Sequence, residues 1–183
     1  MTSLVSLSEV ENNKNMRPQA KDHIPYFSKY IDLIPEGDII SALKANHQTI
    51  LDFIENIPRQ KLNYFYDDGK WTVKQVINHI IDTERILSYR ALRFARGDNQ
   101  QLLGFDENLY AANANLTNTN SQILADEFDS VRLSNILFFK QLSEKELLLK
   151  GKMASGEANV LSLGYFLCGH AQHHINVIKE RYL

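Results

Sequence analysis

The last segment of the chain decides the fold: residues 159–182 read NVLSLGYFLCGHAQHHINVIKERY. Apolar side chains recur in it every three or four residues, which is the spacing of one face of an α-helix, and Asn159 is a suitable cap for its start. One row of this helix continues from Leu163 and Leu167 into His170 and His174. We therefore predict a long helix that carries two histidines on its core-facing side.

These two histidines are four residues apart, slightly more than one helical turn, so both imidazoles project from one side and can bind a single ion. Two inward imidazoles cost desolvation free energy unless a partner takes up their nitrogen lone pairs. The alternative is a pair of core histidines that hydrogen-bond to neighbouring groups, which is the commoner situation for one buried histidine. The pair favours a metal, and a catalytic type of site needs a third protein ligand.

Helical spacing also predicts two long helices in the first half of the chain. The first follows Asp38, which is a suitable N-cap, and ends at Pro58, which cannot continue a helix. The second starts at Thr72, which forms a capping-box pattern with Gln75, and stops near Gly97. Its apolar surface is broad, so we expect it to contact more than one neighbour.

The second half adds a third helix, for which Thr119 and Gln122 form another capping-box pattern. The connection before it is about 20 residues long and carries a short helix around residues 106–114. Gly151 and Gly156 mark a loop before the last helix, and no stretch alternates polar and apolar residues as a strand would. The expected fold is all-α: a four-helix bundle with one long crossover connection.

The start of the chain differs from the rest in composition. Residues 1–17 are polar and are expected to form a disordered tail, which leaves residues 18–183 as a single domain. Three prolines at 18, 25 and 35 are interspersed with aromatic residues. We expect this part to lie as an ordered strap over the core.

Composition excludes several classes of protein. The chain has 183 residues and a net charge of −2, so no strong field points to nucleic acid as a partner. It has no apolar run long enough to cross a membrane and no signal-peptide pattern at its start, and Cys168 is its single cysteine. These features predict a cytoplasmic protein that acts on a small molecule.

The third metal ligand is best sought among the other histidines. His79 lies one turn after Val76 on the second helix, and bundle cores build metal sites from facing helices; a buried histidine bonded to a carbonyl is an equal alternative. His47 also lies on an apolar row and competes as a ligand, as pocket lining or as a core residue. His173 is rotated about 100° from its neighbour and should face solvent or another subunit, and His23 gives no signal.

One familiar metal motif is excluded. A zinc-protease helix needs a glutamate directly after the first histidine of the pair, where it serves as general base. Position 171 is an alanine, Ala171. The general base of that mechanism is therefore missing.

Two stretches together resemble the DinB-like superfamily, and within it the YfiT-like proteins: GKWTVKQVINHIIDTER at residues 69–85 and GHAQHH at residues 169–174, followed by Arg181-Tyr182. The resemblance covers the chain from about residue 25 to its end. It implies a four-helix bundle that holds a divalent metal, nickel or zinc, through His79, His170 and His174. Ala171 departs from the pattern, since relatives often carry glutamate there, so this chain must use another group or lack the step which that carboxylate performs.

The same resemblance bears on activity. Three neutral imidazoles leave an ion with uncompensated charge and an open position, where an activated water gives a hydrolase and a bound thiol gives an S-transferase. DinB-like transferases use low-molecular-weight thiols such as bacillithiol or mycothiol, which implies a metal-dependent S-transferase here. A metal-dependent hydrolase and a non-catalytic metal- or ligand-binding protein are the alternatives. The resemblance is also compatible with a homodimer.

A few polar residues have two interpretations each. Glu84 either accepts a hydrogen bond from a metal ligand or is a surface carboxylate paired with a neighbouring helix, and the second interpretation is favoured. Arg90, Arg93 and Arg96 could bind the carboxylates of an acidic thiol, but a solvated or salt-bridged helix end explains them better. Cys168 lies off the histidine row and should be a small core residue, not a nucleophile.

Overall fold

The computed structural model describes residues 16–183, so all but the last two residues of the expected tail lie outside the described residues. Of those two, Arg17 is bound to the domain. Its guanidinium donates hydrogen bonds to the backbone oxygens of Ile31, at 2.8 Å, and Pro35, at 3.1 Å. The strap that follows is therefore held at its beginning as well as over its length.

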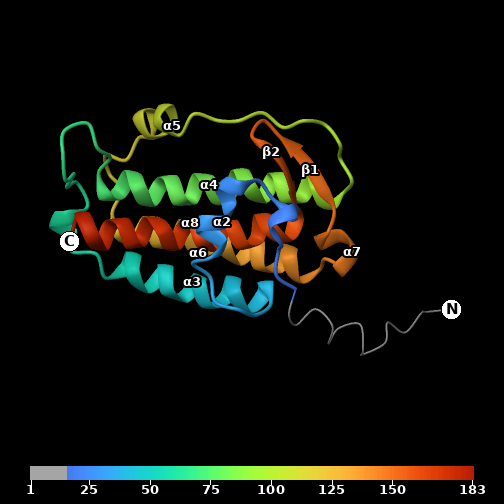
Figure 1. The fold of residues 1–183 in the computed structure, drawn as a ribbon. Helices are drawn as coiled ribbons and strands as arrows, with labels where there is room; N and C mark the ends of the chain where they lie inside the picture. The colour runs from blue at the N-terminus through green and yellow to red at the C-terminus, as the bar shows by residue number, and fades with distance from the viewer. Residues whose placement is uncertain (1–15) are drawn as a thin grey trace.

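Four long helices form the body of the molecule (Figure 1): α3 (Ile39–Glu55), α4 (Val73–Ala95), α6 (Ser121–Lys140) and α8 (Val160–Arg181). The described segments before and between them contain five shorter helices: η2 (Ala20–Asp22), α2 (Pro25–Ile31), η3 (Arg59–Lys61), α5 (Glu107–Asn113) and α7 (Glu144–Leu147). The predicted all-α four-helix bundle is confirmed. None of the described helices combines the length and hydropathy that crossing a membrane requires.

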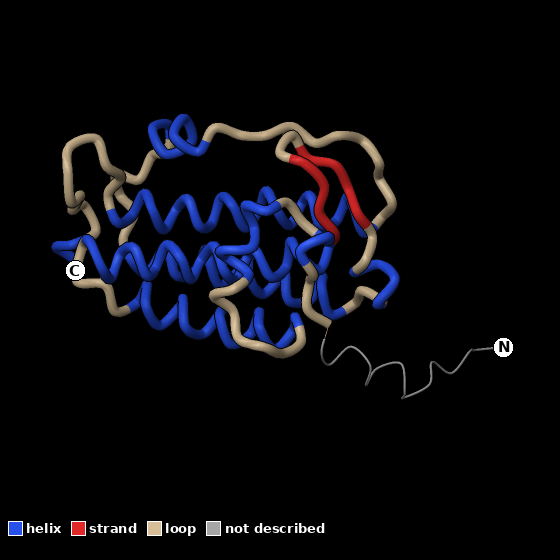
Figure 2. The backbone as a smooth tube through the Cα atoms, viewed as in Figure 1, coloured by secondary structure: helices blue, strands red, loops and turns tan. Residues whose placement is uncertain are grey.

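The order of the helices around the bundle is not their order in the chain. α3 and α4 each pack on both α6 and α8, which places α3 opposite α4 and α6 opposite α8. The colours of Figure 1 show α4 and α6 running in one direction, and α3 and α8 in the other. The connection from α4 to α6 therefore returns along the whole bundle, over α4, and includes α5 (Figure 2). This is the predicted crossover.

Side-chain caps fix where most of the long helices begin. The Asp38 carboxylate accepts hydrogen bonds from the backbone N–H groups of Ile40 and Ser41, and Asn159 accepts one from Ser162 at 2.8 Å. Thr72 and Gln75 form the predicted capping box at the start of α4.

The predicted cap of α6 is wrong. Asn120 is the N-cap, and its side-chain oxygen accepts a hydrogen bond from the N–H of Ile123 at 2.9 Å. Thr119 instead closes the preceding turn, because its own N–H donates to the backbone oxygen of Leu116. Asn and Thr are both good N-caps, and the turn that ends at Thr119 leaves Asn120 as the residue at the cap position.

The prediction of no strands is also wrong. Lys150–Met153 (β1) and Gly156–Asn159 (β2) form an antiparallel hairpin where only a loop was expected. Leu102 of the crossover adds to it, because its N–H donates to the oxygen of Lys152 and its oxygen accepts from Ala154, both at 2.9 Å. The hairpin ties the crossover to the bundle.

The strap contains a short helix, α2, which packs along α8. Gly169 makes this possible, because a Cβ at that position would clash with the backbone oxygen of Tyr30. Phe27 and Tyr30 are buried, and the Phe27 ring lies 4.2 Å from that of Phe166, between centroids. The strap thus becomes one wall of the region around the histidine pair.

The core of the bundle is divided by a layer of polar side chains. One apolar cluster surrounds Leu43 and Leu87, and the other surrounds Ile50 and Ile81. Between them in sequence, on α3, α4 and α6, come the buried residues Asn46, Glu84, Arg132 and Asn135. We call these four residues the polar layer.

Candidate metal centre

Three histidines meet between α4 and α8, which are antiparallel neighbours (Figure 1). His170 Nε2 lies 3.1 Å from His79 Nε2 and 3.1 Å from His174 Nε2. One ligating nitrogen from each ring lies within 4.8 Å of those from the other two. The structure thus brings together the three residues selected from the sequence, His79, His170 and His174.

Local structure accounts for these positions. The capping box at Thr72 starts α4, and His79 lies on its second turn, where its ring centroid is 5.0 Å from that of Trp71. His170 and His174 are successive turns of α8, so their rings share one side of it. The approach of α2 at Gly169 then places the Tyr30 ring 5.8 Å from His170, between centroids.

The environment keeps all three imidazoles neutral. Burial lowers the pKa of His79 to about 4, although the charge of Glu107 acts in the opposite direction. Burial, together with the charges of His79, His173 and Lys29, lowers the pKa of His174 to about 3. Burial and the surrounding imidazoles hold the pKa of His170 well below its ordinary value. At pH 7 the site therefore offers lone pairs, not positive charges.

This donor set fits a divalent metal ion. Three neutral imidazole nitrogens that converge within a few ångströms are the ligands of a catalytic type of zinc or nickel site. Without an ion, the two contacts at His170 Nε2 cannot both be good hydrogen bonds, because a ring nitrogen carries either one proton or one lone pair and so serves one partner well. Within the part of the chain that the structure describes, these three histidines are the only such cluster of potential ligands.

The cluster opens into a cavity of about 500 Å³. Its walls come from the strap, α4, the crossover, the hairpin turn and α8, and they are mainly aromatic and aliphatic. They are formed by Ile24, Pro25, Tyr26, Phe27, Tyr30, Trp71, Thr83, Leu87, Arg90, Phe105, Glu107, Ser155 and Phe166, together with the three histidines. A cavity of this size and lining is suited to a small molecule.

Two charged residues of this cavity were not recognised from the sequence as part of one site. Glu107 belongs to the crossover, and nothing in a short helix on a long connection signals that it returns over His79. Arg90 is 9% exposed and lines the cavity. The prediction of a solvated or salt-bridged helix end holds only for Arg93 and Arg96, which pair with Asp98 and Glu146 respectively. A helical-wheel analysis that placed residue 90 on a different face from residues 93 and 96 would have predicted this difference.

The remaining histidines lie outside the cluster. His47 is not a ligand of it, because its Nε2 pairs with the carboxylate of Asp129 on α6 at 2.8 Å. His173 is half-buried and its ring lies edge-on to Tyr30, with 5.2 Å between centroids. His23 is buried beside Phe27 and bonds to the backbone oxygen of Ile24 through Nδ1. Of the adjacent histidines 173 and 174, the structure therefore brings only His174 into the cluster.

Glu84 is not a surface residue, which corrects the favoured interpretation. It is 1% exposed and forms an ion pair with Arg132, which is 0% exposed. Asn135 donates to its other oxygen at 2.7 Å. Glu84 does pair with a neighbouring helix, as predicted, but in the polar layer inside the bundle and not with a metal ligand. Cys168 is buried beside this layer, as expected of a core residue.

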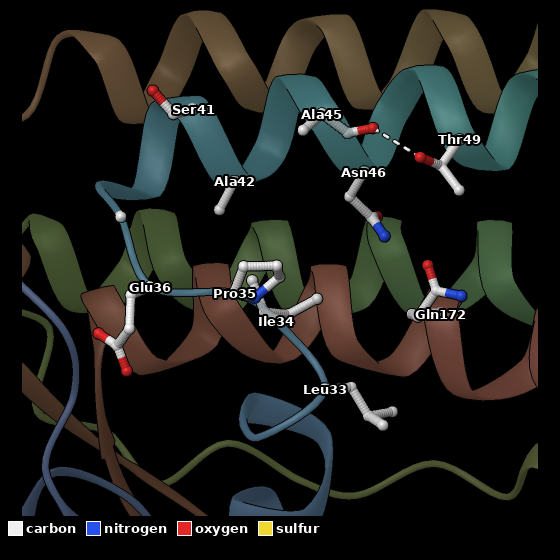
Figure 3. Close-up of a pocket in the computed structure, with 11 residues that line it drawn as sticks. Leu33, Ile34, Pro35, Glu36, Ser41, Ala42, Ala45, Asn46, Thr49 and Gln172 are labelled. Carbon is white, nitrogen blue, oxygen red and sulfur yellow. Dashed lines mark hydrogen bonds between the residues drawn. The ribbon is translucent and has the colours of Figure 1, made fainter.

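A second cavity lies on another side of α8 (Figure 3). It has a volume of about 380 Å³ and is bordered by the α2–α3 turn, by α3 and by Gln172. Its lining is made largely of small side chains such as Ala42, Ala45 and Thr49, and its ionisable member is Glu36. It holds none of the three histidines, so it offers no comparable chemistry.

Comparison with known proteins agrees with this geometry. The structure is similar to that of YfiT from Bacillus subtilis, described as a probable metal-dependent hydrolase with an unusual four-helix bundle topology, with a TM-score of 0.69, 15% sequence identity and 91% of each chain covered. No curated protein sequence matches the chain. A family model described as the DinB superfamily matches residues 42–178, which include all three histidines. The chain therefore belongs to the DinB superfamily.

Proposed function

We propose that this protein is a divalent-metal-dependent S-transferase, in which His79, His170 and His174 hold the ion and a low-molecular-weight thiol of the bacillithiol type is joined to a small electrophile. The observation that carries the proposal is the cluster of three neutral imidazoles on the wall of a largely apolar cavity. A divalent ion in such a site lowers the pKa of a bound thiol or water and so supplies a nucleophile near neutral pH. Zinc and nickel both suit this set of ligands.

The acid–base groups of the cavity favour a thiol over water. A free thiol has a pKa of about 8.5 and needs only a small further shift to ionise at pH 7, whereas bulk water at about 15.7 needs a shift of roughly nine units. Among the described residues, the lining of the cavity has no imidazole beyond the three proposed ligands and one carboxylate, that of Glu107, while position 171 is an alanine. A thiol, which needs little help to lose its proton, is therefore the nucleophile that this lining serves best.

The aromatic walls have a second role. Tyr26, Tyr30, Phe27 and Phe166 enclose one side of the cavity, and the hydroxyl groups of Tyr26 and Tyr30 bond to each other at 2.8 Å. Burial raises the pKa of Tyr26 to about 12, so its hydroxyl group stays protonated at neutral pH. These side chains exclude water from the histidines and offer flat faces to an organic substrate.

A metal-dependent hydrolase is the second candidate, and one residue favours it. Glu107 lines the cavity close enough to His79 for its charge to affect the pKa of that histidine. A carboxylate in this position is suited to accept a proton from water. The similarity to YfiT, which is described as a probable metal-dependent hydrolase, points in the same direction. In a hydrolase, Glu107 would act as the general base, which Ala171 cannot do.

The first experiment measures the metal. Protein purified without an affinity tag is analysed for zinc, nickel, copper and iron, and the geometry around the ion is examined by X-ray absorption. One ion per chain is expected, with nitrogen ligands and an open position, and His79→Ala and His174→Ala should each lose it. His173→Ala is the matched control, since this neighbouring histidine lies outside the cluster. Stoichiometric metal in both ligand variants would refute the site.

The second experiment separates the functions. The metal-loaded protein is incubated with several thiols and the electrophile monochlorobimane, and separately with a nitrophenyl ester. Metal-dependent conjugation that is lost in His79→Ala supports the transferase. Metal-dependent ester cleavage that falls at least 10-fold in Glu107→Gln, without conjugation, supports the hydrolase instead. If the protein binds metal but catalyses neither reaction, it is a binding protein.

A further inference from the structure

Arg90 is a buried cation without a carboxylate partner among the described residues. Its side chain is 9% exposed, and its guanidinium donates one hydrogen bond to the backbone oxygen of Leu103, at 2.8 Å, and one to the sulfur of Met153, at 3.7 Å. The ring of Phe105 lies 6.0 Å away. Arginine has five N–H donors, so three of them have no partner in the part of the chain that the structure describes.

The other arginines of α4, and the one at its C-cap, are different. Arg85, Arg93 and Arg96 each form an ion pair with a carboxylate, although all three are more exposed than Arg90. Burial lowers the pKa of Arg90, but a guanidinium titrates too high to lose its proton at neutral pH. The charge therefore remains, in a place where an unpaired charge is unfavourable.

Arg90 faces the cavity that also holds the three histidines. It is 11 residues after His79 on the same helix, which corresponds to about 16 Å along the helix axis. Glu107, the one carboxylate in the described lining, influences the pKa of His79 and Tyr26, whereas burial alone lowers that of Arg90. The carboxylate thus belongs to the histidine end, and the opposite end carries an unneutralised positive charge.

The wall between these two ends is apolar or uncharged. Leu87 and Phe105 lie along it, and Thr83 contributes a side chain that is 4% exposed. A compact anion would leave this stretch unfilled. A molecule with an extended, largely apolar middle would cover it.

We propose that the cavity binds an elongated small molecule whose terminal anionic oxygen group, a carboxylate or a phosphate, pairs with Arg90 while its other end lies at the three histidines. The planar guanidinium can give such a group two parallel hydrogen bonds from its free donors. The anion supplies the charge that the protein lacks there. Only the identity of the reacting end, a thiol, rests on the proposed function; the anion site does not.

The chain contains its own reporter for this test. Trp71 is the single tryptophan, and it lines the cavity beside His79. Its fluorescence should therefore respond to a ligand that fills the histidine end. Zinc is the appropriate metal for loading, since it has no redox chemistry and no partly filled d shell.

The experiment compares matched probes on the zinc-loaded full chain. Mercaptoalkanoic acids, mercaptoalkyl phosphonates and mercaptoalkanols of about 3 to 11 carbons are titrated, and Kd is read from Trp71 fluorescence. At the best length, the acid or the phosphonate should bind at least 10-fold more tightly than the alcohol, and the stronger of the two identifies the class of anion. Arg90→Met should reduce this ratio to about 2 or less and leave the Kd of the alcohol unchanged.

Arg96→Met is the control, because it removes the same charge from the C-cap of α4, outside the cavity, and should keep the full ratio. If Arg90→Met does not fold, Arg90→Lys replaces it, and the acid ratio should fall because a lysine lacks the planar fork. Equal Kd values for acids and alcohols in the unmodified protein would overturn the proposal. So would a preference for acids that persists in Arg90→Met, since the anion would then be bound by the zinc.

A last pair of probes distinguishes this proposal from the proposed function. 6-Phenylhexanoate and 6-phenylhexanol contain no thiol, so their comparison tests the anion site alone. A preference for the acid that depends on Arg90, in a protein that binds no thiol, would uphold the anion site and refute the transferase. Thiols that bind equally tightly with and without a terminal acid would refute the anion site and leave the proposed transferase unaffected.

Discussion

The backbone oxygen of Tyr30 occupies the space beside Gly169 that a side chain would need, because a Cβ at position 169 would clash with it. This contact lets α2 rest on α8 one residue before His170, and it turns the strap into a wall of the cavity. A glycine within a long helix lowers its intrinsic stability. Here that loss is offset by the packing of a second helix.

Gly169→Ala should therefore displace α2. We expect the free energy of unfolding to fall by about 1–3 kcal/mol, as for other overpacked sites. Urea denaturation followed by circular dichroism measures this. Gly104→Ala is the control, because its Cβ would meet only Ala154, at an ordinary 3.9 Å. Equal stability of the two variants would show that α2 does not depend on position 169.

Removing the metal should lower the thermal stability of the protein. An ion that binds only the folded state, at a free concentration 100 times its Kd, adds about 2.7 kcal/mol. The Tm should fall when a chelator is added to the unmodified protein, and the chelator should have no effect on His170→Ala. His47→Ala should keep the response, since His47 pairs with Asp129 and lies outside the cluster. A chelator effect that survives in His170→Ala would place the ion elsewhere.

The ion pair in the polar layer should be costly to break on one side. Arg132→Met leaves the Glu84 carboxylate buried without its charge partner, and the loss should be about 3–5 kcal/mol. The double variant with Glu84→Gln should recover part of this loss, because the uncompensated charge is gone. Chemical denaturation of the two single variants and the double variant measures the coupling. Additive losses would mean that the two groups do not interact.

Thr83 and Ser88 should respond differently to the loss of their hydroxyl groups. The hydroxyl of Thr83 is buried and has no hydrogen-bond partner among the described residues, so Thr83→Val should change stability by less than about 0.5 kcal/mol or increase it. The Ser88 hydroxyl lies within hydrogen-bond distance of the backbone oxygen of Glu84 and of Asn135 Oδ1 and donates its one proton between them, so Ser88→Ala should cost about 0.5–1.5 kcal/mol. A larger loss for Thr83→Val than for Ser88→Ala would contradict this assignment.

Alkaline pH should destabilise the protein partly through Cys168. Burial raises the pKa of this thiol from 9.0 to about 12. Above pH 9 the unfolded chain therefore loses a proton that the folded chain keeps, and the free energy of unfolding falls as the pH rises toward 12. Between pH 9 and 11 the decline should be steeper for the unmodified protein than for Cys168→Ala. Parallel curves would mean that the thiol is accessible to solvent in the folded state.

Sequence reasoning was most successful where local rules decide the structure. Helical spacing predicted the four long helices, and the caps at Asp38, Thr72 and Asn159 were identified correctly. The histidine pair followed from a spacing of four on an apolar row. The position of His79 on the second helix made it the best candidate for a third ligand, the family resemblance supported it, and the structure brings all three rings together.

Features that depend on tertiary contacts were missed. β1 and β2 have no strand pattern, and they pair because the hairpin closes over Phe94 beside Gly151 and is joined by Leu102 of the crossover. Glu84 is an ionisable residue whose burial is tolerated only because Arg132 arrives from another helix. Glu107 reaches the cavity through a connection whose path no local pattern encodes. The homodimer and the cytoplasmic location stay predictions.

The diagonal arrangement of the helices has a consequence for how the chain folds. Neither α3 with α4 nor α6 with α8 forms a principal packed pair, so a hairpin of consecutive helices cannot serve as an early stable unit at either end of the chain. Contacts between distant parts of a sequence slow folding, because each requires closure of a long loop. His79 and His170 are 91 positions apart. The three histidines therefore come together only when the last helix, α8, docks against α4.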